Sequence, residues 1–251
     1  MLTSQRKTHL LAVLSRDGEI VAKSMSRELG LSEDTIRRDL RELAAEGRLQ
    51  RVHGGALPAS PAIADVAGRR QISSAAKTAI GKAAARMVRS GQVVFLDGGT
   101  TTEAMARQLP LDLNATIATH SPGVALALVD HPRVEVLLIG GRLFRHSIVA
   151  VGADAIEAIG RIRADSYFMG VTGVHPEVGL STGDAEEAAI KRALVRVAAE
   201  TVVLASREKL GAASPYVVCP AADAAYLVVE RGLAASITRP YEALGMTVIK
   251  A

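Results

Sequence analysis

Two stretches near the amino terminus decide the fold of the first part of the chain: Ser32-Glu-Asp-Thr-Ile-Arg-Arg-Asp-Leu40 and Gly47-Arg-Leu-Gln-Arg-Val-His-Gly-Gly-Ala56. The first begins with a serine, whose hydroxyl can accept a backbone N–H of a helical first turn. Two acidic residues follow it and complement the positive end of that helix. At about 3.6 residues per turn, Ile36, Leu40 and Leu43 fall on one side. The sequence therefore predicts a helix that packs one face and exposes the other.

The exposed face of this helix, predicted over residues 33–46, displays three arginines: Arg37, Arg38 and Arg41. An exposed arginine can reach phosphates or grip a guanine edge with two hydrogen bonds, worth roughly 1–3 kcal/mol of discrimination. Thr35, near the helix start, is placed for a phosphate or a thymine methyl. The alternative is a solvated helix whose arginines pair with Asp39 and Glu42.

The surroundings of this helix favour DNA binding over a solvated surface. Helical patterns over Ser4–Arg16 and Ala22–Leu29 precede it, and Gly30 makes a turn before it, as in a helix-turn-helix. The residues after it alternate polar and apolar, as one strand of a small wing does. Arg51 and His53 share a face of that strand, suited to phosphate or minor-groove contact. Taken alone, His53 would be an ordinary surface histidine.

A segment containing two prolines divides the chain. Residues 54–68 show no sustained helical or strand period, and we interpret them as a linker. We therefore expect a small domain at residues 1–57, a linker at residues 58–67 and a larger domain at residues 68–251.

The larger domain alternates helical runs with apolar runs of strand length. Helices are predicted at Ser74–Arg89, Thr102–Gln108 and Ala185–Ala199. Strands are predicted at Val93–Leu96, Thr116–Thr119, Val134–Ile139, Tyr167–Gly170, Thr201–Ala205 and Tyr226–Val229. Such alternation predicts a Rossmann-like α/β domain, in which a parallel sheet carries helices on its faces.

Several predicted strands end in small polar residues. Val93–Leu96 continues into Asp-Gly-Gly-Thr-Thr-Thr102, and a helix is expected to begin near Glu103. Glycines let the backbone approach an anion, to which helix amides and threonine hydroxyls can donate. Taken alone, such a turn is more often only a turn, and neither a P-loop nor a Rossmann glycine fingerprint is present. Because parallel sheets bind ligands outside the carboxyl ends of their strands, the loops at Thr119–Ser121 and Gly140–Gly141 should converge on the same crevice.

Two lysines are candidates for this crevice. Lys209 follows the apolar strand Thr201–Ala205, a position that favours the carboxyl edge of the sheet. Lys191 stands four residues after Glu187 on a predicted helix, and this spacing would equally give an ordinary surface ion pair.

The composition is that of a folded protein of 251 residues, because 49% are hydrophobic and 22% charged. The net charge of +4 is modest, so a nucleic-acid role depends on where the charges lie. Cys219, the single cysteine, excludes an internal disulfide and is expected to be buried. The histidines are scattered without metal-ligand spacing, and we expect neither a metal nor a cofactor. The amino-terminal segment is too short and too mixed for a signal peptide or membrane span, which predicts a cytoplasmic protein.

The two stretches at residues 32–40 and 47–56 closely resemble the winged helix-turn-helix signature of the DeoR family of bacterial transcriptional repressors. Because two separate motifs recur at the right spacing, the match is specific. The resemblance implies sequence-specific binding of double-stranded operator DNA by residues 1–57. With the exposed helix face, it gives these candidate DNA contacts: Ser32, Thr35, Arg37, Arg38, Arg41, Arg51 and His53.

The larger half resembles the effector domain of the same family, which is similar to the sugar-phosphate isomerase fold. The shared segments are Phe95–Thr102, Thr119–Ser121, Leu138–Gly141, Asp165–Gly173 and Val203–Lys209. The resemblance implies that a phosphorylated sugar or related metabolite is bound by Asp97, Gly99, Thr100, Thr101, Thr102, Thr119, Ser121, Lys191 and Lys209. Two positions depart from the family pattern, which usually has Asn at His120 and Asp at Ser206. Loss of that carboxylate alters the contacts near Ser206, and the His120 imidazole can add charge to the site.

Three functions are weighed on these features: a metabolite-gated repressor, a sugar-phosphate isomerase with an accessory DNA-binding domain, and a general DNA-binding protein whose larger domain serves assembly. An isomerase needs a positioned general base, and sequence spacing identifies a partner for none of the candidate carboxylates, so we assign no catalytic residue. The third function leaves the Gly/Thr loops unexplained. We therefore predict a repressor of carbohydrate metabolism genes that binds DNA as a homo-oligomer, without membrane association.

Overall fold

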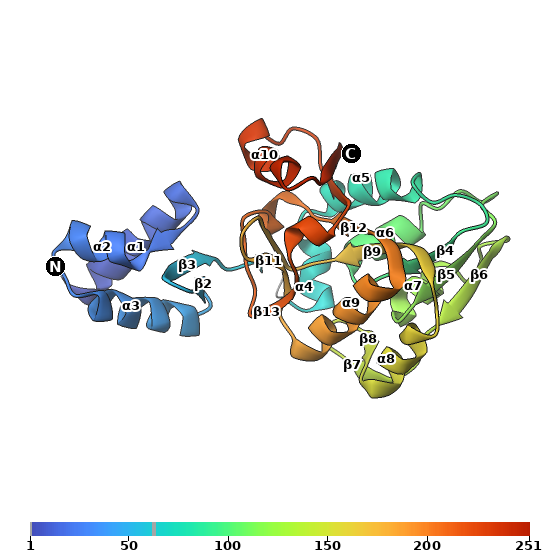
Figure 1. The fold of residues 1–251 in the computed structure, drawn as a ribbon, viewed down its shortest axis with the longest axis horizontal. Coiled ribbons are helices and arrows are strands. Elements are labelled where there is room, and N and C mark those ends of the chain that lie inside the picture. The colour runs from blue at the N-terminus through green and yellow to red at the C-terminus, as the bar shows by residue number, and fades with distance from the viewer. Residues whose placement is uncertain (1, 62–63) are drawn as a thin grey trace.

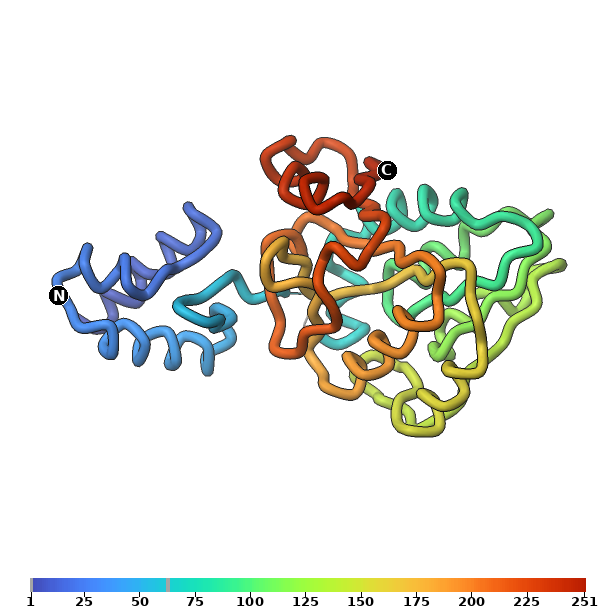
Figure 2. The backbone as a smooth tube through the Cα atoms, in the orientation of Figure 1, coloured from blue at the N-terminus to red at the C-terminus, as the bar shows by residue number. Residues whose placement is uncertain are grey.

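The computed structural model describes residues 2–61 and 64–251 and places a small amino-terminal lobe beside a larger α/β domain (Figure 1). The backbone passes from one to the other once (Figure 2). The helices of the lobe are α1 (Thr3–Asp17), α2 (Ala22–Leu29) and α3 (Glu33–Ala45). Its strands are β1 (Ile20–Val21), β2 (Leu49–Val52) and β3 (Gly55–Pro58).

The lobe is a winged helix-turn-helix, as the sequence predicted. Leu10 of α1 packs with Ile36, Leu40 and Leu43 of α3, and all four side chains are buried. The three strands form an antiparallel sheet in the order β1-β3-β2 beside these helices. Burial of one apolar stripe on α3 leaves its arginine face outside the core.

The interpretation of residues 54–68 as a segment without strand is wrong at its beginning. Gly54, with φ of 78°, turns the chain back so that β3 pairs with β2, Arg51 opposite Ala56. β3 is the middle strand, and its successive residues Ala56 and Leu57 are both buried, so it lacks the polar–apolar alternation of a strand with one exposed face. Another short helix, α4 (Val66–Gln71), begins within the expected linker.

The larger domain is built on seven parallel strands, which confirms the predicted sheet. Their order is β15-β14-β12-β9-β4-β5-β6. Their bounds are β4 (Val93–Leu96), β5 (Ala115–Thr119), β6 (Val134–Leu138), β9 (Ala164–Gly170), β12 (Ala198–Leu204), β14 (Tyr226–Val229) and β15 (Thr247–Lys250). The sequence interpretation missed β15 and found the other six.

Helices cover both faces of this sheet (Figure 1). They are α5 (Ser74–Ala85), α6 (Thr100–Ala106), α7 (Pro122–Ala127), α8 (Ala153–Gly160), α9 (Ala185–Val197) and α10 (Ala235–Ala243). Val94 and Leu96 of β4 pack with α5, α6 and α7, whereas Phe95 joins the core of the opposite face with α8, α9 and α10. The near-continuous apolar strands reflect burial on both sides.

Smaller elements surround the carboxyl edge of the sheet. The strands β7 (Arg142–Phe144) and β8 (Val149–Val151) form a hairpin. The strands β10 (Gly173–His175), β11 (Gly179–Thr182) and β13 (Tyr216–Cys219) form an antiparallel sheet, and η2 (Arg207–Lys209) is a single 3₁₀ turn. None of these was predicted, since each is too short for a periodic pattern.

The central strands β4 and β9 form the topological switch point of the sheet, because successive strands lead away from them in opposite directions. Cys219 is buried as expected, and burial raises the pKa of its thiol to about 12, which keeps it unreactive. Of the helices within residues 2–61 and 64–251, none has the length and apolar character needed to traverse a bilayer.

Candidate functional site

Hydroxyl side chains cap the first turn of α3. The Ser32 hydroxyl accepts the Thr35 backbone N–H at 3.3 Å, and the two hydroxyl oxygens lie 3.0 Å apart. Arg37, Arg38 and Arg41 are all exposed on the face away from the core. The helix therefore offers hydroxyls at its first turn and guanidinium groups along the next two.

Of the three arginines on this face, one is held in an ion pair. Asp39 is buried and accepts two hydrogen bonds from Arg6 of α1, and Glu42 pairs with Lys7 at 3.0 Å. The alternative in which Asp39 and Glu42 neutralise the exposed arginines is therefore wrong. Arg37 pairs with Glu33 at 2.7 Å. Within the described residues, no ion pair holds Arg38 or Arg41.

The wing adds two further exposed side chains. Arg51 lies in β2, and His53 lies in the turn between β2 and β3. The lobe thus carries all seven candidate DNA contacts on α3, its N-cap and the wing.

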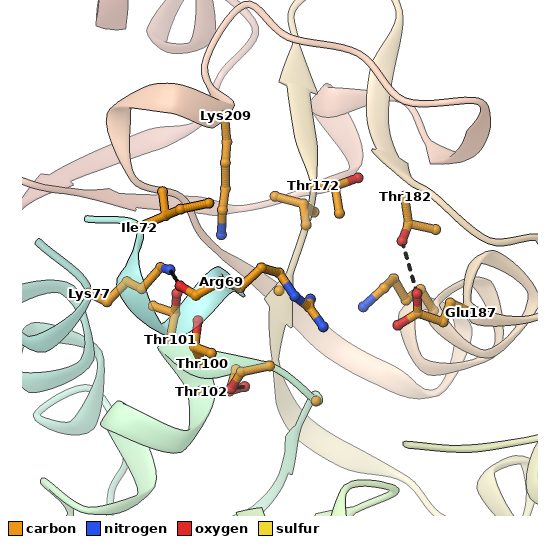
Figure 3. Close-up of a pocket in the computed structure, with 15 residues that line it drawn as sticks. Arg69, Ile72, Lys77, Thr100, Thr101, Thr102, Thr172, Thr182, Glu187 and Lys209 are labelled. Atoms are coloured by element: carbon orange, nitrogen blue, oxygen red, sulfur yellow. Dashed lines mark hydrogen bonds between the residues drawn. The ribbon is translucent and has the colours of Figure 1, made fainter. Parts of the chain in front are cut away.

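A pocket lies at the carboxyl ends of β4, β9 and β12 (Figure 3). We call it the lysine pocket and define it by these lining residues: Arg69, Lys77, Gly99, Thr100, Thr101, Thr102, Thr172, Glu187, Lys191 and Lys209. Figure 3 shows Lys209 and Arg69 extending into it, with the threonines of α6 facing them. Four cationic side chains therefore surround one small space.

Of the nine candidate effector residues, Gly99, the threonines 100–102 and both lysines line this pocket. Asp97, Thr119 and Ser121 do not. The Thr119 hydroxyl accepts the Ser121 backbone N–H at 3.1 Å, and the Ser121 hydroxyl caps α7 by accepting the Val124 N–H at 3.4 Å. These two hydroxyls hold the loop after β5 in shape.

The glycine turn after β4 explains how the threonines enter the pocket. Gly99, with φ of 128°, adopts a backbone conformation that is unfavourable for residues other than glycine, and α6 starts at the next residue. The expected start near Glu103 is therefore wrong. Because α6 begins at Thr100, the first-turn N–H groups of Thr100–Thr102 have no earlier helical carbonyl to bind.

Lys191 forms an ion pair with the fully buried carboxylate of Asp97 and not with Glu187, so the surface-pair alternative is wrong. The same carboxylate accepts the backbone N–H of Gly98 at 2.8 Å and of Gly170 at 2.9 Å. Burial acts to raise the pKa of Asp97, but the Lys191 charge and the His120 hydrogen bond outweigh it and hold that pKa well below its usual range.

His120 also acts through Asp97. Its Nε2 lies 2.9 Å from Asp97 Oδ1 and its Nδ1 lies 2.9 Å from the carbonyl oxygen of Ala150. Both ring nitrogens thus have an oxygen within hydrogen-bonding distance. His120 therefore links the loop after β5 to the hairpin strand β8 behind the pocket. At the other departure from the family pattern, the buried Ser206 hydroxyl donates to Glu208.

Two of the three lysines of the pocket, Lys209 and Lys77, have no ion-pair partner among the described residues. The Lys77 ammonium instead donates to the carbonyl oxygen of Arg69. Burial lowers the pKa of Lys209 to about 8, and the charges of Lys77 and Arg69 act in the same direction. Cations held together in a low-dielectric space favour an anionic ligand.

Sequence reasoning missed Arg69 and Lys77. Arg69 lies on α4 directly after the expected linker, and Lys77 lies on the first helix of the larger domain. The sequence signal is that the basic residues from Arg69 to Arg89 have no acidic residue between them, which is equally typical of a solvated surface.

The chain matches the DeoR-like helix-turn-helix domain over residues 6–61 and the DeoR C terminal sensor domain over residues 72–231. It belongs to the DeoR family of transcriptional regulators. The HTH-type transcriptional regulator GlpR of Haloferax volcanii is 35% identical over 99% of this chain and 98% of that protein. The glycerol-3-phosphate regulon repressor of Escherichia coli K12 is 28% identical over 84% of each chain.

Among solved structures, a ribose 5-phosphate isomerase from Methanocaldococcus jannaschii covers 53% of this chain and 52% of its own, with 18% identity and a TM-score of 0.40. That likeness is too distant to bear on activity. As a member of the DeoR family, the chain is a DNA-binding transcriptional regulator with a carboxy-terminal sensor domain, as its sequence predicted.

Proposed function

We propose that this DeoR-family regulator represses genes of carbohydrate metabolism, and that a phosphorylated sugar or related metabolite in the lysine pocket gates its binding to operator DNA. The observation that carries the proposal is Lys209, a buried ammonium directed into a pocket that two further cations and Lys191 also line. A phosphate dianion offers the charge and the acceptor oxygens that such a pocket lacks.

Individual donors fit a phosphate group. The Lys209 ammonium and the hydroxyls of Thr100 and Thr101 face the same space from opposite sides. Lys191, already paired with Asp97, contributes its field more than a hydrogen bond. We therefore assign direct phosphate contact to Lys209, Thr100 and Thr101, with Asp97 positioning Lys191.

On the DNA side, we propose that Arg38 and Arg41 are the principal contacts of α3. Both are exposed and lack an ion pair within the described chain, whereas Arg37 must first exchange Glu33 for DNA. Winged helices of this kind read two half-sites as symmetric dimers, so we infer a homo-oligomer.

We infer that the sensor domain binds its ligand without turnover. Aldose–ketose isomerisation needs a carboxylate free to take a proton from carbon. Asp97 is ion-paired with a strongly lowered pKa, which makes it a weak base. These features, and the regulator names of its relatives, support a sensor in preference to an isomerase.

The two domains are linked by the polypeptide chain and by a hydrogen bond, and both can couple ligand binding to DNA binding. The loop after Lys209 reaches the end of the wing, where the Ala213 N–H donates to the Pro58 carbonyl at 3.3 Å. An effector that binds two arrangements of this junction unequally shifts operator affinity, typically by about 1–3 kcal/mol.

The test combines a ligand screen with a DNA-binding assay on the full chain. Thermal shift with a panel of sugar phosphates identifies stabilising ligands, and fluorescence anisotropy with operator DNA then measures affinity with and without the best of them. We expect stabilisation by phosphorylated but not dephosphorylated sugars, and a change in operator affinity of about fivefold or more. Equal stabilisation by both forms would overturn the proposal.

A further inference from the structure

A second cavity adjoins the lysine pocket. It is lined by Arg69, Phe144, His146, Ser147, Thr172, Asp184 and Glu187, and we call it the adjoining chamber. It shares Arg69, Thr172 and Glu187 with the lysine pocket, so the two are continuous. Residues of the β7–β8 hairpin line the chamber but not the lysine pocket.

The sizes of the two spaces differ strongly. The lysine pocket measures about 30 Å³, and the chamber measures about 290 Å³. By this measure one water needs about 10–15 Å³, so the lysine pocket has room for about two or three waters and is too small for a whole sugar phosphate. Two spaces share lining residues with the lysine pocket: the chamber, and a smaller one of about 180 Å³ that shares Lys77 and Thr100. The chamber is the larger of the two and offers more room for the rest of a phosphorylated ligand.

The charges of the two spaces also differ in sign. Lysines 77, 191 and 209 line the pocket alone, whereas Asp184 lines the chamber alone and Glu187 stands at the junction. Carboxylates repel a phosphate but accept hydrogen bonds from sugar hydroxyls. This polarity orients a ligand with its phosphate toward Lys209 and its hydroxyls toward Glu187 and Asp184.

Arg69 stands at the junction with unused hydrogen-bonding capacity. Its Nη2 donates to the Ser147 hydroxyl at 3.2 Å, but its buried Nε–H has no hydrogen-bond partner in the described part of the chain. A buried donor without an acceptor is destabilising unless a ligand supplies one. An oxygen of the bound ligand at the junction would satisfy it.

We propose that the adjoining chamber is the subsite for the polyhydroxyl body of the effector, and that Glu187 and the half-buried ring of Phe144 select for it. This inference rests on the proposed function of the lysine pocket. Within the proposed class of phosphorylated sugars, it assigns the choice among hydroxylated bodies to these two side chains. The phosphate group binds in the lysine pocket, and contacts in the chamber determine which of these molecules binds most tightly.

The test is isothermal titration of the full-length protein with inorganic phosphate, glycerol 3-phosphate, ribose 5-phosphate and glucose 6-phosphate. In the wild type, the tightest of the three organic phosphates should bind at least about tenfold more tightly than inorganic phosphate. In Glu187→Gln, that ratio should fall about fivefold or more. A carboxylate acceptor for hydroxyls is lost, whereas inorganic phosphate, which that carboxylate repels, should bind no more weakly than to the wild type. Phe144→Leu should lower the ratio in the same direction.

The matched control is Glu200→Gln, which removes the same charge from an exposed position of β12 and lines neither space. It should leave the ratio unchanged. An unchanged ratio in both Glu187→Gln and Phe144→Leu, with thermal melts showing that they fold, would overturn the chamber as a subsite while the phosphate site stands. If the wild type binds none of the four probes, the proposed function itself is wrong and the chamber falls with it.

Discussion

The ammonium of Lys191 on α9 forms a buried ion pair with the carboxylate of Asp97, 94 residues earlier at the end of β4. Because Asp97 also accepts the Gly170 N–H at the end of β9, this pair ties together the two strands of the switch point and the helix that covers them. The floor of the lysine pocket is therefore part of the core of the domain.

Removal of one partner from this pair should destabilise the protein. Lys191→Met leaves the Asp97 carboxylate buried without a counter-charge, and the free energy of unfolding should fall by about 3–5 kcal/mol. Urea unfolding of the full chain measures it. The double variant Asp97→Asn, Lys191→Met should recover part of the loss, and Lys82→Met, at an exposed position of α5, serves as control. A loss no larger than that of the control would contradict the assignment.

Operator binding should depend on the unpaired arginines of α3. Arg38→Ala and, separately, Arg41→Ala should weaken binding by about 1–3 kcal/mol where the arginine reads a base, or uniformly across sequences where it holds a phosphate. Arg37→Ala should follow the same rule, reduced by its pairing with Glu33. Anisotropy with a mapped operator and a scrambled duplex separates the two cases. The control is Arg89→Ala on the larger domain, and wild-type affinity in both Arg38→Ala and Arg41→Ala would discard the interface.

Effector affinity should depend on Lys209. Lys209→Ala removes a charge-assisted contact worth roughly 1.5–3 kcal/mol, so the ligand concentration for half-maximal effect on DNA should rise about tenfold to a hundredfold. Operator affinity without ligand should stay near the wild-type value, because Lys209 lies in the larger domain. Titration calorimetry and anisotropy on the same preparation measure both. Should the wild type convert aldose phosphates at about 1 per second or faster, and Lys209→Ala lose that activity, an isomerase would replace the sensor.

The pKa of Lys209 also predicts a pH dependence. Burial lowers that pKa to about 8 from an ordinary value of 10.5, so the folded ligand-free protein loses this proton before the unfolded chain does. Phosphate affinity should therefore fall above about pH 8, approaching tenfold per pH unit as the neutral amine predominates. Lys209→Met should abolish this slope, and the same affinity at about pH 7 and pH 9.5 in the wild type would argue against a charged Lys209 contact.

The same shift has a definite sign for stability. Between about pH 8 and 10.5 the unfolded chain binds more protons at Lys209 than the folded chain does, so its contribution to the free energy of unfolding rises with pH. The difference between wild type and Lys209→Met across this window isolates the effect from other titrating groups.

The local sequence pattern was enough to predict much of the secondary structure of this protein. The spacing of Ile36, Leu40 and Leu43 set the buried stripe of α3, and the apolar runs set six of the seven strands, because contacts within one element follow its period. The carboxyl ends of parallel strands meet at one edge, so Thr100–Thr102 and Lys209 were predictable neighbours. The segment at β3 was not, because a strand buried on both faces has no alternation to detect.

The sequence by itself thus determined the two domains, the arginine face and the glycine–threonine edge of the sheet. Tertiary structure decided which charges are free: Asp39 pairs with Arg6 and Lys191 with Asp97, which leaves Arg38 and Lys209 available to ligands. It also brought Arg69 of α4 to the junction of the pocket and the chamber. The physical reason is that spacing along the chain reports only neighbours on the same helix or strand, whereas a buried charge takes its partner from whichever element packs against it.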